Sequence, residues 1–254
     1  MCVPINIDHL LGSEMSEFPK AKQRNGRRKG RPTAKGSVGR DALIAAAREV
    51  LKRRPPGEIT LNELSQVAGV DPALVRYYFG QLPALFTEAA TEITRDLRGR
   101  LAAAASQKGS VRDRLHRRVR AYMEVFRANP NYNKLMIEAV NQTDNPNRQT
   151  ILGLVSHSIE EMRDLALEGV RTGDIKSVEG RLLQLAIVAM CEFFFSARPV
   201  FEAIFGREAK DPKFADAYSR FVVSLIACPE ADGAKTRTRK KRGSNQKHRA
   251  SGRR

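Results

Sequence analysis

The sequence predicts an all-α protein of about nine helices, arranged as a small N-terminal three-helix unit followed by a larger helical domain. Apolar residues recur at helical spacing along most of the chain, and no segment alternates apolar and polar residues between hairpin turns. Hydrophobic residues make up 41% of the chain, whereas aromatic residues make up 6% and Trp is absent. A core of this kind is packed mainly by Leu, Ala, Ile and Val, as in helical proteins.

The first helix is expected over RDALIAAAREVLKR, residues 40–53, and the prolines that follow end it. Two short helices come next, between residues 60 and 79. Ser177 and Asp211 are the expected N-caps of the last two helices of the chain. The first helix has one apolar face, formed by Leu43, Ile44, Ala47, Val50 and Leu51. Breaks at Gly, Pro and Asn place the remaining helices at about 83–104, 111–128, 131–140, 148–171, 177–197 and 212–227.

The net charge of +17 is concentrated in two tails. Residues 20–40 contain nine Lys or Arg and residues 235–254 contain ten, in both cases without an acid. Between them, residues 41–234 hold 26 basic and 25 acidic residues. Blocks of like charge resist folding and often bind polyanions. We therefore expect a disordered basic arm at 1–38 and a disordered basic tail at 231–254, which either binds nucleic acid or only solubilises the protein.

Several classes of protein are disfavoured. Cys2, Cys191 and Cys228 stand far apart, which argues for a reducing compartment and against a disulfide framework or structural zinc. The start of the chain lacks the features of a secretory signal, and the richest apolar stretch, 182–195, is too short to span a membrane. No catalytic triad, glycine-rich nucleotide loop or paired acid/base site is visible. We expect a cytoplasmic protein that is no enzyme, has no cofactor or metal and does not bind membranes.

Residues 60–79, TLNELSQVAGVDPALVRYYF, have the pattern of two short helices joined by a tight turn. Thr60 and Glu63 fit a capping box at the start of the first helix. Gly69 can adopt the positive φ that the turn requires, and Asp71 can cap the second helix. Such a pattern is typical of a helix-turn-helix, in which the second helix enters the major groove of DNA. An ordinary helical hairpin in a protein core would show the same spacing.

Residues 40–86 resemble the DNA-binding domain of the TetR/AcrR family of bacterial transcriptional regulators. RDALIAAAREVL resembles the family's first helix, TLNELSQVAGV its second helix and turn, and YYF followed by LPALF the junction to its fourth helix. A looser resemblance continues to about residue 227. It implies a homodimer that binds a near-palindromic operator and releases it when a small molecule binds. The implied domains are a DNA-binding domain at 39–82 and an effector-binding and dimerisation domain at 83–230.

The resemblance also implies site residues. Arg76 stands where the family usually has a phosphate-contacting tyrosine, and Leu82 stands where it usually has a lysine that touches the DNA backbone. Arg76 would contact a phosphate, pair with guanine, or remain a solvated surface charge. Without this lysine, the slope of log affinity against log salt concentration would be smaller by about 0.9. Thr60 would contact a phosphate, and the recognition helix would present Asp71, Pro72, Ala73, Leu74, Arg76 and Tyr77 to the DNA.

The basic arm contains Lys29-Gly30-Arg31-Pro32, which resembles the core of an AT-hook. Lys29 and Arg31 would then lie in a narrow A·T-rich minor groove beside the recognition helix, where the enhanced negative potential attracts arginine. The alternative is that the arm attracts phosphates in general, without a preference for sequence.

The helix at 177–197 is apolar almost all round, so it must be buried on more than one side. Together with residues 221–227 it would form the dimer interface that the resemblance implies, or it is the core helix of a monomer. His157 and Glu161 stand one helical turn apart, which is too little for a metal site. The effector pocket implied by the resemblance would be lined by Tyr122, Met123, Phe126, Met136, His157, Met190 and Phe194, each of which is otherwise a core residue.

The sequence therefore predicts a ligand-responsive transcriptional repressor that is associated with the nucleoid. It would bind double-stranded DNA as a homodimer through residues 60–79 and respond to an unidentified small-molecule effector. The alternative is a nonspecific architectural protein that binds nucleic acid through its two basic tails.

Overall fold

The computed structural model describes residues 34–207 and 211–228 of the 254-residue chain. These residues form ten α-helices and one short 3₁₀ helix, and the pairing of Ile175 with Ala227 is the one isolated β-bridge among them. The prediction of an all-α protein is confirmed. The expected basic tail and most of the expected basic arm, including Lys29 and Arg31, lie outside the described residues.

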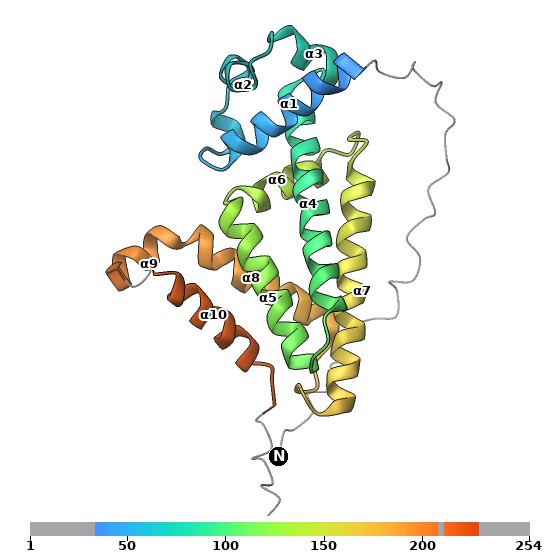
Figure 1. Ribbon diagram of the computed structural model, residues 1–254, viewed down its shortest axis with the longest axis vertical. Coiled ribbons are helices and arrows are strands. Elements are labelled where there is room, and N and C mark those ends of the chain that lie inside the picture. The colour runs from blue at the N-terminus through green and yellow to red at the C-terminus, as the bar shows by residue number, and fades with distance from the viewer. Residues whose placement is uncertain (1–33, 208–210, 229–254) are drawn as a thin grey trace, which may run out of the picture.

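The N-terminal unit consists of α1 (Ala34–Leu51), the 3₁₀ helix η1 (Pro56–Glu58), α2 (Leu61–Ala68) and α3 (Ala73–Phe79), and it lies at one end of an elongated molecule (Figure 1). The apolar face expected on α1 is confirmed, since all five of its residues are buried. However, α1 begins at Ala34, inside the range 1–38 assigned to the arm. Pro32 is the last residue before it that would break a helix.

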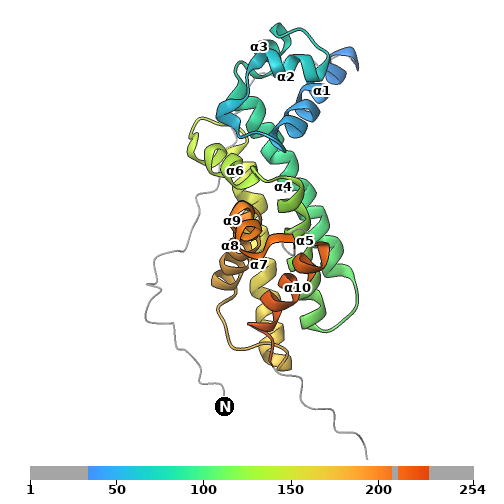
Figure 2. The same ribbon diagram turned by 90° about the vertical axis from the view of Figure 1, so that its left-hand side faces the viewer.

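The body of the molecule contains seven helices. The longest ones, α4 (Leu82–Ser106) and α7 (Arg148–Thr172), run side by side, and α4 leads from the N-terminal unit into the body (Figures 1 and 2). The others are α5 (Val111–Ala128), α6 (Tyr132–Asn141), α8 (Gly180–Ser196), α9 (Arg198–Phe205) and α10 (Pro212–Ser224).

The caps explain where several of these helices begin. Ser110 and Asp113 form a reciprocal capping box at the start of α5. Asp211 caps α10 as predicted, because its carboxylate accepts a hydrogen bond from the N–H of Lys213 at 2.8 Å. The prediction of Ser177 as the cap of α8 is wrong: the carboxylate of Glu179 accepts the hydrogen bond from the N–H of Leu182, at 2.8 Å, and α8 starts three residues later than expected.

Among the described residues, α9 is the one α-helix that the sequence did not predict. It begins directly after α8, with Pro199 in its first turn, where proline's missing N–H costs nothing. The two helices meet at 65°. Among the described residues no single helix is long and apolar enough to cross a membrane. Helices α8 and α9 together have the required length and apolar composition, but the chain bends between them.

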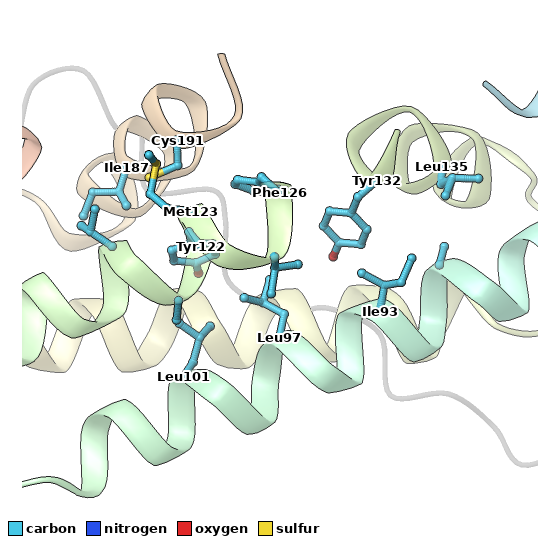
Figure 3. Packing of buried hydrophobic residues seen from close by; sticks show 14 of the residues in the cluster. Ile93, Leu97, Leu101, Tyr122, Met123, Phe126, Tyr132, Leu135, Ile187 and Cys191 are labelled. Carbon is cyan, nitrogen blue, oxygen red and sulfur yellow. The ribbon is translucent and has the colours of Figure 1, made fainter. Parts of the chain in front are cut away.

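One hydrophobic core runs from the N-terminal unit through the body. In the body it is formed where α4, α5, α6 and α8 meet. Figure 3 shows Leu97 and Leu101 of α4 facing Tyr122 and Phe126 of α5, with Tyr132 of α6 beside them. The cluster therefore connects α4, which carries the N-terminal unit, to the helices of the body.

Candidate nucleic-acid interface

Half of the capping box predicted at the start of α2 is formed. The hydroxyl oxygen of Thr60 accepts a hydrogen bond from the backbone N–H of Glu63 at 3.3 Å. The carboxylate of Glu63 does not return to Thr60, because both of its oxygens accept hydrogen bonds from Arg54 at 2.8 Å. The reciprocal half of the box is therefore wrong, and Glu63 instead connects the start of α2 to the chain that follows α1.

The turn between α2 and α3 has the predicted geometry. Gly69 ends α2 with φ 65° and ψ 33°, the left-handed conformation that costs a residue with a Cβ about 1–2 kcal/mol. The carboxylate of Asp71 accepts a hydrogen bond from the N–H of Ala73 at 2.7 Å, as expected of a helix cap. Pro72 lies in the αR region, so it already has the backbone conformation of α3.

The two sides of α3 differ in burial. Val75 is fully buried, and Leu74 and Tyr78 are half-buried against the core. Arg76 and Tyr77 lie on the other side, where Tyr77 is 78% exposed. Asp71, Pro72 and Ala73 are exposed as well. A helix in a protein core would not expose its bulky aromatic residue to this extent, so the structure disfavours the core-hairpin alternative.

Ion pairs occupy the side chains of most basic residues in this unit. Residues 39–82 contain six Lys or Arg and five Asp or Glu. Arg76 differs from the other five cations, because it pairs with no residue that the structure describes. The five pairs are Arg40 with Glu88 at 2.9 Å, Arg48 with Asp96 at 2.5 Å, Lys52 and Arg53 with Glu49 at 2.7 and 3.1 Å, and Arg54 with Glu63 at 2.8 Å.

The exposed side of α3 therefore offers one unpaired guanidinium, one phenol and a small apolar surface. A guanidinium can pair bidentately with guanine or with a phosphate, and small apolar side chains can contact the methyl group of thymine. The carboxylate of Asp71 already accepts a backbone hydrogen bond, so its second oxygen is the acceptor that remains for a base. These groups are suited to a polyanion with base edges exposed in a groove.

Five of the seven predicted effector residues line two cavities in the body. A cavity of about 120 Å³ between α4, α5, α6, α7 and α8 brings together Tyr122, Phe126 and Met136. A second cavity, of about 300 Å³ between α5, α8, α9 and α10, contains Met123 and Phe194.

His157 and Met190 line neither of these two cavities. His157 is exposed on α7, with its ring 3.3 Å from the carboxylate of Glu161. No group of three potential metal ligands occurs in the described part of the chain.

A buried polar network beside the smaller cavity was not predicted. Arg118 is buried and donates to the carbonyl and the hydroxyl oxygen of Ser158, both at 2.7 Å. The hydroxyls of Ser158 and Tyr122 are 3.0 Å apart, and the amide of Gln184 donates to the Tyr122 hydroxyl at 2.5 Å. Gln184 gave the one sequence signal of this network, as a polar residue inside the apolar run of α8.

Glu161 connects this network to α4. Its carboxylate is 2.7 Å from Arg98 and 3.2 Å from Arg118. Burial works against ionisation of Glu161, but the adjacent guanidinium groups of Arg98 and Arg118 outweigh it and hold its pKa below the ordinary value. Glu161 is therefore a carboxylate at neutral pH, shared between two guanidinium groups.

Solved structures share this architecture. A regulatory protein of the tetR family from Rhodococcus RHA1 has 18% identity and a TM-score of 0.62, over 76% of this chain and 98% of that chain. FadR from Bacillus subtilis in complex with stearoyl-CoA has 17% identity and a TM-score of 0.56, over 73% and 96%. The ketosteroid transcriptional regulator KstR2 of Mycobacterium tuberculosis has 15% identity and a TM-score of 0.57, over 82% and 98%.

The sequence itself gives a family match in the body of the molecule. Residues 112–226 match the family model described as "Tetracyclin repressor-like, C-terminal domain", which covers α5 to α10. The body of the molecule is therefore similar to the C-terminal domain of tetracycline-repressor-like proteins, and its fold is that of tetR-family structures. None of the curated proteins matches the chain. The match does not include the N-terminal unit, but α2, the turn at Gly69 and α3 have the arrangement of the helix-turn-helix that the resemblance of residues 40–86 implies.

The two departures from the TetR/AcrR pattern differ in their surroundings. Leu82 is half-buried and packs against the core, so its side chain contributes to the junction between the helix-turn-helix domain and α4. Arg76 is exposed and unpaired among the described residues. Compared with the TetR/AcrR pattern, α3 therefore carries an additional exposed cation and the start of α4 lacks one.

Proposed function

We propose that the protein is a ligand-responsive transcriptional repressor that binds a near-palindromic operator in double-stranded DNA as a homodimer. The observation that carries this proposal is the exposed side of α3, on which Arg76 and Tyr77 face solvent while Val75 anchors the helix in the core. An α-helix held in this way fits the major groove. Thr60 lies exposed at the start of α2, where it can meet a phosphate.

The basic arm provides the phosphate contacts that the folded domain lacks. Since five of the six cations at residues 39–82 are paired with acids, the domain alone has little charge to offer DNA. Each neutralised phosphate adds about 0.9 to the salt slope of binding. Residues 20–33 carry seven Lys or Arg, including Lys29 and Arg31. We expect most of the salt dependence to come from this arm.

Two copies associate through an apolar face that a single chain leaves exposed. Within one chain α8 is buried on one side only, by residues such as Leu183 and Ile187. Helices α8, α9 and α10 lie on one side of the molecule, which faces the viewer in Figure 2. A two-fold axis through this face would place two copies of α3 on successive half-sites. The exposed apolar residues are Leu182, Leu185, Phe193, Val200, Ile204, Phe205, Phe221 and Leu225.

The ligand response would begin in the body. The smaller cavity adjoins α4, the helix that carries the helix-turn-helix domain. Asn131 donates a hydrogen bond from its side-chain amide to the carbonyl of Leu51, at 2.8 Å. Since Asn131 directly precedes α6, a ligand that moves Tyr132 would also disturb the end of α1. Such a ligand shifts the protein away from the DNA-binding state by as much as its affinities for the two states differ.

Binding of the full-length protein to fragmented host DNA tests the proposal. We expect enrichment of a near-palindromic site that binds about 10³-fold or more tightly than random DNA. A variant limited to residues 34–228 should bind more weakly and with a smaller salt slope, but should still prefer that site. If the shortened variant lost all discrimination, or if the full-length protein showed none, the architectural alternative would be the better description.

Arg76→Ala should weaken operator binding by about 1–3 kcal/mol if the guanidinium pairs with a base, with a smaller effect on random DNA. Arg53→Ala is the matched control, because Arg53 is exposed on the same domain but pairs with Glu49. The measurement is a titration of both variants with operator and random DNA at fixed salt. If the variant lost affinity equally for operator and random DNA, Arg76 would contact only the DNA backbone. If it lost no affinity, Arg76 would not lie in the interface.

A further inference from the structure

We infer that the smaller cavity of the body binds a small monocarboxylate whose apolar part is about one six-membered ring in size. The inference deepens the proposed function, on which it rests for the biological role of the site. Three independent features of the cavity carry it: its volume and walls, a surplus hydroxyl proton at its polar end, and an uncompensated positive charge beside it.

Volume and walls define the apolar part of the ligand. The cavity measures about 120 Å³, somewhat less than the roughly 150 Å³ of an apolar cavity that holds benzene. The rings of Tyr122 and Phe126 stack with centroids 6.0 Å apart, and Phe126 lies 6.0 Å from Tyr132. Figure 3 shows these three rings with Leu97 and Leu101 opposite. The apolar lining is completed by Met136, Leu154, Val155 and Val188.

At the polar end of the cavity there is one more hydroxyl proton than there are acceptors for it. The hydroxyls of Tyr122 and Ser158 carry one proton each but make one hydrogen bond with each other. Their other partners, Gln184 and Arg118, are both donors. Ser158 makes no hydrogen bond to a carbonyl of its own helix among those found in the described residues, unlike Thr94, which donates to Ala90. One hydroxyl proton is therefore left without an acceptor, and both residues line the cavity.

The second hydroxyl pair in the cavity has no such surplus. Thr94 donates to the carbonyl of Ala90 at 2.7 Å, so its oxygen accepts the proton of Tyr132 at 3.0 Å. Burial raises the pKa of Tyr132 to about 12, which keeps this hydroxyl protonated at neutral pH. Tyr132 has consequently no proton to offer a ligand. A ligand acceptor is required at Tyr122 and Ser158 and not at Tyr132.

The charges beside the cavity favour a carboxylate as that acceptor. Arg98 lines the cavity, and its guanidinium shares one carboxylate, that of Glu161, with Arg118. The neighbouring acid Glu168 is paired with Arg114. Asp164 lies 3.7 Å from Arg163, which also pairs with Glu160 at 2.8 Å, and it forms no ion pair with Arg98 or Arg118 among those found in the described residues. In direct contact, two cations therefore face one anion. A ligand carboxylate would accept the surplus hydroxyl proton and also balance the remaining positive charge, which a neutral acceptor cannot do.

Isothermal titration calorimetry of the full-length protein without DNA tests this site. The probes are benzoate, benzyl alcohol, which has the ring but no charge, and acetate, which has the charge but no ring. We expect benzoate to bind at least about tenfold more tightly than either of the other two, because a hydrogen bond to a charged group contributes more than a neutral one. Equal binding of benzyl alcohol, or no binding of benzoate, would overturn the inference.

Variants locate the site. The double variant Tyr122→Phe/Ser158→Ala removes both hydroxyls and should weaken benzoate binding at least about tenfold, whereas Tyr132→Phe, on the same cavity, should change it less than about threefold. Arg98→Gln should weaken benzoate but leave benzyl alcohol unchanged, and it serves as the second test if the double variant fails to fold. Unchanged benzoate binding in Arg98→Gln or in a folded double variant would overturn the inference.

The ligand experiment is separate from the test of the proposed function. Binding of benzoate is measured without DNA, so it does not depend on an operator. If benzoate binds as expected but does not release the protein from its operator, the site is upheld and the ligand-responsive part of the proposed function fails for this ligand. If the protein prefers no DNA sequence at all, the regulator proposal fails and the calorimetric result still stands.

Discussion

Gly180→Ala is expected to destabilise the protein by about 3 kcal/mol, the upper end of the range for overpacked sites. Gly180 is the first residue of α8 and is buried against α7. A Cβ at this position would lie 2.4 Å from the Cα atom of Arg163 and 3.0 Å from its backbone nitrogen. Backbone atoms cannot rotate away as a side chain can, so α7 and α8 must separate. The two helices form the most extensive contact in the fold.

Gly153→Ala is the matched control for this effect. Gly153 lies within α7 and is exposed, and a Cβ there would meet nothing within 4 Å. The same substitution should therefore stabilise the protein by about 0.5–1 kcal/mol, through the better helix propensity of alanine. Urea unfolding of the two variants and of the wild type measures these changes in the free energy of unfolding, which should have opposite signs. A Gly180→Ala variant as stable as the wild type would show that α7 and α8 are not packed at this distance.

The different packing of these two glycines could not be predicted from the sequence. Both residues lie inside helical patterns, and nothing in their neighbours distinguishes them. The difference arises from Arg163, which is close to Gly180 in space but 17 positions away along the chain. Contacts of this kind depend on how helices pack, which local periodicity does not specify.

The helix-turn-helix was predictable because its signals are local. Capping by Thr60, the positive φ of Gly69 and the cap at Asp71 all act within three residues along the chain, and each is found in the structure. The competition of Arg54 for Glu63 was not predictable, because it depends on how the chain turns after α1. For the same reason, the sequence pointed to Tyr122 on the cavity but missed its partner Ser158, 36 positions away.

The bend after α8 was a missed local signal. Arg198-Pro199 marks a new helix start, since proline is favoured in the first turn and its ring restricts the residue before it. The apolar character of both segments concealed the break. The consequence is functional, because the bend turns the exposed residues of α9 away from the axis of α8 on the side proposed for dimerisation.

Leu185→Glu is expected to make the protein monomeric and to weaken its binding to a palindromic operator by about 100-fold or more. Leu185 is 60% exposed and lies on the same side of α8 as Phe193, which is 59% exposed. On a two-fold axis each substitution occurs twice, so two carboxylates would enter one apolar interface without a partner. Loss of the dimer also loses the second half-site, which a dimer binds at high effective concentration.

Leu167→Glu makes the same chemical change outside the proposed interface, since Leu167 is 65% exposed on α7. Light scattering at micromolar concentration should find it dimeric and the Leu185→Glu variant monomeric. DNA containing one half-site separates the loss of the dimer from damage to α3: there the Leu185→Glu variant should bind as a wild-type protomer does. If this variant stayed dimeric, the interface would lie elsewhere; if it were monomeric with unchanged operator affinity, DNA binding would not need two copies. A monomeric variant that binds one half-site normally but the full operator weakly would show that DNA binding by α3 depends on the apolar side of α8, at the far end of the molecule.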